Sequence, residues 1–92
     1  MAAQTDRIES ITRAFLERGE RSGLDWDELA EVCNRHIRSR AQSSIVDAVT
    51  LAHRFVTKSQ DCNGAMLQTA YRASGWVNLL GGRYRQARDA YL

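Results

Sequence analysis

Apolar residues recur along this chain at intervals of three and four, the spacing that places side chains on one face of a helix. The clearest stripe lies in the middle of the chain and consists of Ile45, Ala48, Val49, Ala52, Phe55 and Val56. Similar stripes occur on either side of it, and no alternation of strand period reaches a useful length. The sequence therefore predicts an all-α fold.

Capping residues and glycines indicate where the helices begin and end. Gly19 and Gly23 follow a first stripe over 6–18 and end that helix. Asp25 can cap a second helix, because its carboxylate can accept hydrogen bonds from free backbone amides. Ser43 and Ser44 interrupt the second stripe and offer hydroxyl caps for the third helix. The polar stretch KSQDCNG then predicts a turn before a fourth helix.

Two adjacent glycines, Gly81 and Gly82, predict the end of the fourth helix after Leu80. Each glycine lowers helix stability by about 1 kcal/mol relative to alanine. A fifth helix is expected from Arg83 to Leu92. Because the connections are short, neighbouring helices should be antiparallel, and about five helices should form consecutive hairpins in a single domain over 1–92.

The last third of the chain combines small and aromatic residues at fixed offsets, namely Tyr71, Gly75, Ala87 and Tyr91. Small residues let the two helices of a hairpin touch, while bulky ones fill the space between hairpins. With these residues and the stretch GRYRQARDAYL, the chain resembles the tetratricopeptide repeat family. Ser74 and Asn78 depart from the family pattern, which usually has leucine and tyrosine there.

The resemblance implies a short α-solenoid of stacked antiparallel hairpins. It implies a truncated hairpin over 63–92, a degenerate hairpin over 25–60 with Cys33 as its small residue, and a packing or capping helix over 1–24. The sequence stops at Leu92, inside the second helix of a repeat. We therefore expect either a fragment of a longer repeat protein or a second copy of the chain that supplies the missing surface.

Repeats of this family bind peptides or protein segments on a concave surface, which implies a protein-interaction or scaffold module. With Tyr71 and Gly75 assigned to packing, the groove candidates on the fourth helix are Thr69, Arg72, Trp76 and Leu79. Trp76 is either an apolar anchor in the groove or a residue buried under a neighbouring helix, and both readings stay open. Arg72 would favour an acidic ligand through its planar donor fork.

Two other functions are considered beside the groove. One is a self-association or effector-coupling domain of a larger signalling protein. A homodimer would then form through the fifth helix and its apolar edge of Tyr84, Ala87, Ala90 and Tyr91. The other is nucleic-acid binding, which ranks lowest because the net charge is only +2 and no recognition motif is present. Charge is unevenly distributed, with a balance of −4 over 1–31 and +6 over 32–92.

The sequence predicts neither a catalytic site nor a metal site. Cys33, His36, His53 and Cys62 have suitable atoms for zinc, but their spacing matches no zinc motif. Neither a phosphate loop nor a dinucleotide fingerprint occurs, so we expect no enzyme and no cofactor. The sequence shows no secretory signal and no membrane-spanning run, which predicts a cytoplasmic protein with reduced cysteines.

Overall fold

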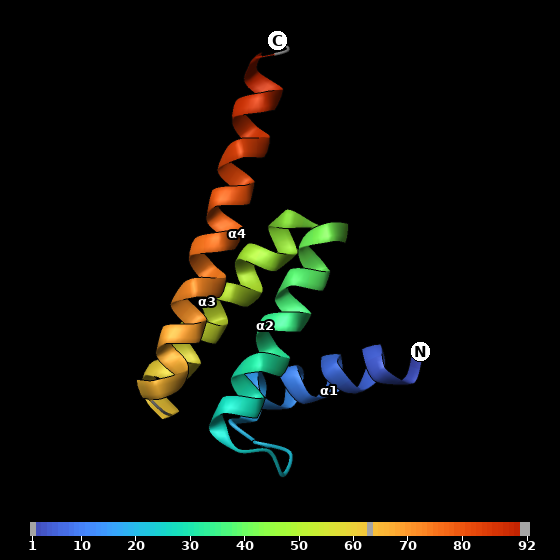
Figure 1. Ribbon diagram of the computed structural model, residues 1–92, viewed down its shortest axis with the longest axis vertical. Coiled ribbons are helices and arrows are strands. Elements are labelled where there is room, and N and C mark those ends of the chain that lie inside the picture. The colour runs from blue at the N-terminus through green and yellow to red at the C-terminus, as the bar shows by residue number, and fades with distance from the viewer. Residues whose placement is uncertain (1, 63, 91–92) are drawn as a thin grey trace.

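The computed structural model describes the backbone of residues 2–62 and 64–90, and the side chains over 7–62, at 64 and over 66–82. The described chain consists of four helices: α1 (Ala2–Arg18), α2 (Trp26–Ser43), α3 (Ile45–Cys62) and α4 (Gly64–Ala90). Helices α2 and α3 form an antiparallel hairpin, and α3 forms another with α4, whereas α1 crosses α2 steeply (Figure 1). The predicted all-α class is thus confirmed, and two antiparallel hairpins are present.

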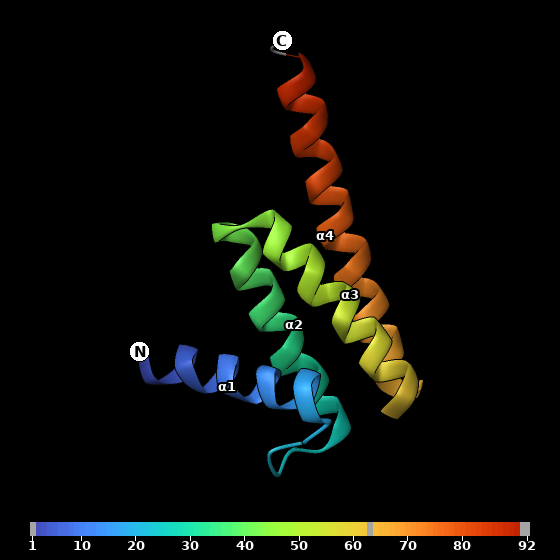
Figure 2. The same ribbon diagram turned by 180° about the vertical axis from the view of Figure 1, so that it is seen from behind.

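The helices form two layers. Helices α2 and α4 run in the same direction and lie toward the viewer in Figure 1, whereas α1 and α3 lie toward the viewer in Figure 2. The second half of α4 extends beyond the connection between α2 and α3 (Figure 1). One face of the protein is therefore built from α2 and α4 together, although 20 residues separate the two helices in the sequence.

The end of α1 is fixed by Gly19, as predicted. Its φ of 71° lies in the left-handed region, where glycine has no Cβ penalty. The amide of Gly19 donates to the carbonyl of Phe15, and that of Glu20 donates to Ala14, a pair of bonds that closes a helix at its C-terminus. A short loop containing Gly23, whose φ is 79°, then turns the chain into α2.

Side-chain caps start the next two helices at the predicted residues. A carboxylate oxygen of Asp25 accepts from the amide of Glu28 at 2.8 Å, which satisfies one of the free donors at the start of α2. Ser44 closes α2 by donating its amide to the carbonyl of Arg40. The hydroxyl of Ser44 also accepts from the amide of Asp47 at 3.3 Å and so starts α3.

The core lies where the helices meet and contains two fully buried aromatic rings. Phe15 of α1 and Phe55 of α3 pack edge to face with their centroids 6.3 Å apart. Small residues line the contacts of α4 with α2 and α3, and the buried alanines of these helices are Ala30, Ala41, Ala48, Ala52, Ala70 and Ala73. Cys33 is fully buried, in agreement with its expected role as a small apolar filler.

The predicted break at Gly81 and Gly82 is wrong. Helix α4 continues through both residues to Ala90, so four helices are described instead of about five, and residues 64–90 are one helix where a hairpin was expected. Gly81 lies against the first turn of α3, because a Cβ placed on it would stand 3.3 Å from the Cγ2 of Ile45. This close approach explains why a glycine is accommodated inside the helix despite its low propensity.

The contact expected between Gly75 and Ala87 is also not formed. Both residues lie on α4, where twelve residues of α-helix span about 18 Å along the axis. A Cβ placed on Gly75 would meet no other atom within 4 Å, and Tyr71 is 54% exposed. The buried face of α4 consists instead of Met66, Ala70, Ala73 and Val77.

The turn predicted over KSQDCNG is shorter than expected, because α3 continues to Cys62. Ser59 is fully buried one turn after Phe55, and Cys62 packs against the core. These side chains extend the buried face of α3 through a stretch whose composition is otherwise polar, so tertiary contacts here outweigh local turn propensity.

Substitution of glycine by alanine tests the course of α4. Gly75→Ala and Gly82→Ala should each raise the free energy of unfolding by about 0.5–1 kcal/mol, because both glycines are helical and a Cβ would meet nothing within 4 Å. Thermal denaturation would show an increase of a few degrees in Tm. A loss of stability in Gly75→Ala would place this residue at a helix crossing, and a loss in Gly82→Ala would indicate a turn.

Candidate functional site

The four groove candidates lie on one side of α4, the side next to α2. They follow one another at spacings of three, four and three residues, which keeps them on a single helical stripe. Thr69 and Trp76 are half-buried, whereas Arg72 and Leu79 are exposed, Leu79 at 57%. The structure therefore brings these four residues together, with the exposed pair turned further away from the core.

The sequence left open whether Trp76 lies in a groove or is buried under a neighbouring helix, and the structure combines the two. It is partly buried and packs against the hydrophobic core. The guanidinium of Arg38, from α2, lies over its ring at 5.1 Å from the ring centroid. Such a cation–π contact holds the arginine at the surface and orients its donors. Trp76 is thus anchored in the protein and carries a positive charge on its outer side.

Arg38 is a site residue that the sequence analysis did not assign. It stands out in the sequence as one of three nearby arginines on α2, with Arg35 and Arg40, but nothing in the sequence places it beside Trp76. The contact arises because α2 and α4 pack together in the fold. We call the set Arg38, Thr69, Arg72, Trp76 and Leu79 the α2–α4 face.

The α2–α4 face is built from two stretches of sequence that contain no acidic residue. Neither Asp nor Glu occurs over 32–46 or over 62–88. Within the described residues, Arg35, Arg38 and Arg72 form no ion pair with a carboxylate. No Asp or Glu lies within one helical turn of Arg38 or Arg72 in the sequence, so the face presents positive charge around a tryptophan and an exposed leucine.

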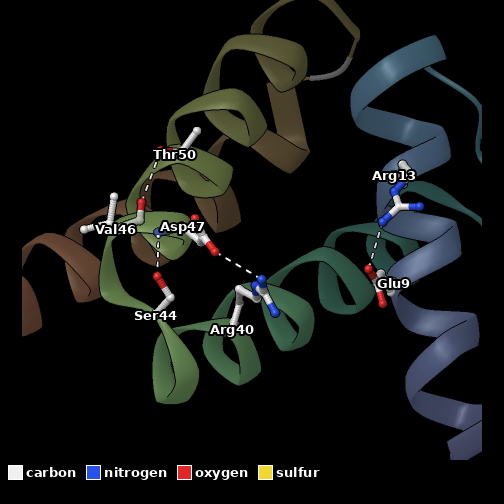
Figure 3. A network of polar contacts seen from close by, with 7 residues as sticks. All are labelled: Glu9, Arg13, Arg40, Ser44, Val46, Asp47 and Thr50. Atoms are coloured by element: carbon white, nitrogen blue, oxygen red, sulfur yellow. Dashed lines mark hydrogen bonds and ion pairs between the residues drawn. The ribbon is translucent and has the colours of Figure 1, made fainter.

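A separate polar cleft of about 270 Å³ lies between α1, α2 and α3. In Figure 3, the ion pair of Arg13 with Glu9 lies on one side of this region, and that of Arg40 with Asp47 lies on the other. The charged residues that line the cleft, besides His36, are Glu9, Arg13, Glu17, Arg40, Asp47 and Arg54. Three carboxylates balance three guanidiniums, so this cleft favours neither an anion nor a cation.

A second hollow, of about 730 Å³, lies at the corner between α2, α3 and α4. Its lining includes Ile45, Val49, Gly81 and the 75%-exposed Val46, and none of its lining residues is charged. Its polar lining consists of neutral amides and hydroxyls, from Gln42, Ser43, Ser44, Thr50 and Asn78, so the hollow offers hydrogen bonds but no charge to a ligand.

Burial alters the protonation of two side chains. Partial burial lowers the pKa of His36 below its usual value, Glu9 opposes this shift, and Arg40 and Arg13 add to it. Burial also raises the pKa of the Cys33 thiol to about 12, against a hydrogen bond with Thr12 that acts in the other direction. At neutral pH this thiol is protonated, whereas a nucleophile or a metal ligand would need to be a thiolate.

Over the part of the chain with described side chains, no three His, Cys, Asp or Glu residues form a group suited to a metal ion. Cys33 and Cys62 are both free thiols. The side chains of the apolar edge assigned to the fifth helix, from Tyr84 to Tyr91, lie outside the described residues. The α2–α4 face is therefore the surface on which a functional argument can be built.

Comparison with known proteins gives no family for this chain. No protein-family model matches it, and neither the curated proteins nor the solved structures include a significant match. The residues and geometry of the α2–α4 face therefore carry the functional argument.

The lowered pKa of His36 predicts how stability depends on pH. The unfolded chain binds the His36 proton more readily than the folded chain, so His36 makes the folded state less stable as the pH falls through about 6.5. His36→Gln should lose less stability than the unsubstituted protein between pH 7 and pH 5, as measured by urea denaturation at each pH. An equal loss in both proteins would contradict the assigned environment of His36.

Proposed function

We propose that this protein is a protein-interaction module and that the α2–α4 face binds an acidic segment of a partner protein. The observation that carries the proposal is the position of Arg38 over the half-buried ring of Trp76, beside an exposed Leu79 and an unpaired Arg72. A carboxylate can form charge-assisted hydrogen bonds with either guanidinium, and an apolar side chain can contact the leucine and the indole.

The physical advantage of this face is that one of its two cations, Arg38, is already positioned by its contact with Trp76. An arginine that stacks on an aromatic ring loses less conformational freedom on binding than a free surface arginine. The ring of Trp76 is fixed by its own contacts with the core. Binding therefore requires little rearrangement, and the partner segment needs only carboxylates spaced to reach Arg38 and Arg72.

None of the described helices has the length and apolar character that crossing a bilayer requires. The resemblance to tetratricopeptide repeats does not support this proposal, because residues 64–90 form one helix and the contact between Gly75 and Ala87 that it implied does not occur.

Binding of a defined acidic peptide tests the proposal. The probe is a short peptide with glutamates flanking a leucine, and its fluorescence titration uses Trp76 as the reporter in a Trp26→Phe background. Arg38→Gln and Arg72→Gln should each weaken binding about tenfold, because a hydrogen bond between charged groups contributes about 1.5–3 kcal/mol. Arg72→Gln should leave Tm nearly unchanged, since its side chain is exposed.

The matched control is Arg54→Gln, which removes the same charge from an exposed position of α3 in the polar cleft. Its peptide affinity should equal that of the Trp26→Phe parent. A second control peptide carries glutamine in place of glutamate and should not bind. Equal weakening by all three substitutions, or retention of the protein on DNA in a salt-sensitive manner without peptide binding, would overturn the proposal.

A further inference from the structure

One stripe of α2 carries charges of opposite sign at its two ends. The stripe consists of Asp27, Glu31, Arg35, Arg38 and Gln42, at spacings of four, four, three and four residues, and all five side chains are exposed. Its first half is acidic and its second half is basic. We call this set the α2 stripe, and it shares Arg38 with the α2–α4 face.

Of the four charged residues of the α2 stripe, Arg38 contacts the ring of Trp76, and the other three form no polar contact with a described residue. Among the described residues, Asp27, Glu31 and Arg35 take part in no hydrogen bond or ion pair through their side chains. Glu31 and Arg35 lie one turn apart on the same helix and still form no pair. At the start of α2, the charge of Asp25 raises the pKa of Glu28, because the two carboxylates lie close together.

Because the acidic residues precede the basic ones, the stripe is complementary in charge to a second copy of itself that runs in the opposite direction. If two copies of α2 lie antiparallel, Asp27 of one copy stands opposite Arg38 of the other, and Glu31 stands opposite Arg35. The register fits because Asp27 and Arg38 are about 16 Å apart along the helix, and Glu31 and Arg35 lie between them. A two-fold axis through the middle of the stripe then generates four complementary pairs from two copies.

We propose that the acidic segment bound by the α2–α4 face is the first half of α2 in a second copy of this chain, so that the protein forms a two-fold symmetric dimer through the α2 stripe. This inference rests on the proposed function and names its partner. Trp76 of α4 lies beneath Arg38 in the basic half of the stripe, and the exposed Leu79 follows three residues later on α4, so that both can add apolar contact to the charge pairs. Exposed ion pairs contribute little each, so the dimer is weak and sensitive to salt.

Charge reversal with rescue tests the dimer. Asp27→Lys with Glu31→Lys makes the stripe wholly positive, and Arg35→Glu with Arg38→Glu makes it wholly negative. By sedimentation equilibrium at low salt, the unsubstituted protein should dimerise, and each double variant alone should dimerise at least tenfold more weakly. An equimolar mixture of the two double variants should form a heterodimer, because every pair is again complementary.

Further measurements separate the dimer from a general effect of charge or folding. Circular dichroism should show unchanged helix content in both double variants. A variant with all four charges exchanged, Asp27→Arg, Glu31→Arg, Arg35→Glu and Arg38→Glu, should dimerise like the unsubstituted protein. Raising the salt concentration roughly tenfold should dissociate the dimer. Monomeric behaviour of the equimolar mixture would overturn the proposed dimer.

The outcomes also distinguish this inference from the proposed function. A chain that stays monomeric at all concentrations but binds the acidic peptide would overturn the dimer and support binding of another protein. A chain that dimerises should lose its dimer when the acidic peptide is added, because both occupy the α2–α4 face. Absence of both dimer and peptide binding would overturn both proposals.

Discussion

The packing of α4 against α2 and α3 is the contact on which the rest of the structure depends. Buried alanines on all three helices allow the helix axes to approach closely, and larger buried residues such as Ile37, Phe55 and Val77 fill the space beside them. Without this contact, α4 would be an isolated helix, and the residues of α2 that pack against α4 would be exposed to solvent. The position of Trp76 beneath Arg38 follows directly from this packing.

The same packing separates two kinds of polar surface. On the side of α1 and α3, charged residues pair across and along the helices, as with Arg40 and Asp47, and they hold the corner of the bundle in place. On the side of α2 and α4, Arg35, Arg38 and Arg72 are exposed and form no ion pair with any other described residue. Paired charges contribute mainly to local geometry, whereas unpaired charges beside an aromatic ring can recognise another molecule. The functional proposals follow from this difference.

Local sequence signals identified most of the secondary structure because they act within a few residues. Gly19 ends α1 through its positive φ, Asp25 caps α2, and Ser44 caps α3, all as the sequence predicted. These local signals predicted the wrong helix ends where a segment packs against residues that are distant in the sequence. Gly81 remains helical because it packs against Ile45, which lies 36 positions earlier in the chain, and α3 continues to Cys62 because Ser59 faces the core.

The sequence by itself determined the all-α class, the three caps and the stripe on which Thr69, Arg72, Trp76 and Leu79 lie together. These properties depend on helical periodicity and on hydrogen bonds between near neighbours. Only the tertiary structure decided that α4 is continuous and that Arg38 joins the site. It also placed two acid-free stretches side by side on one face. Such contacts between distant segments depend on the packing of whole helices, and no local pattern encodes them.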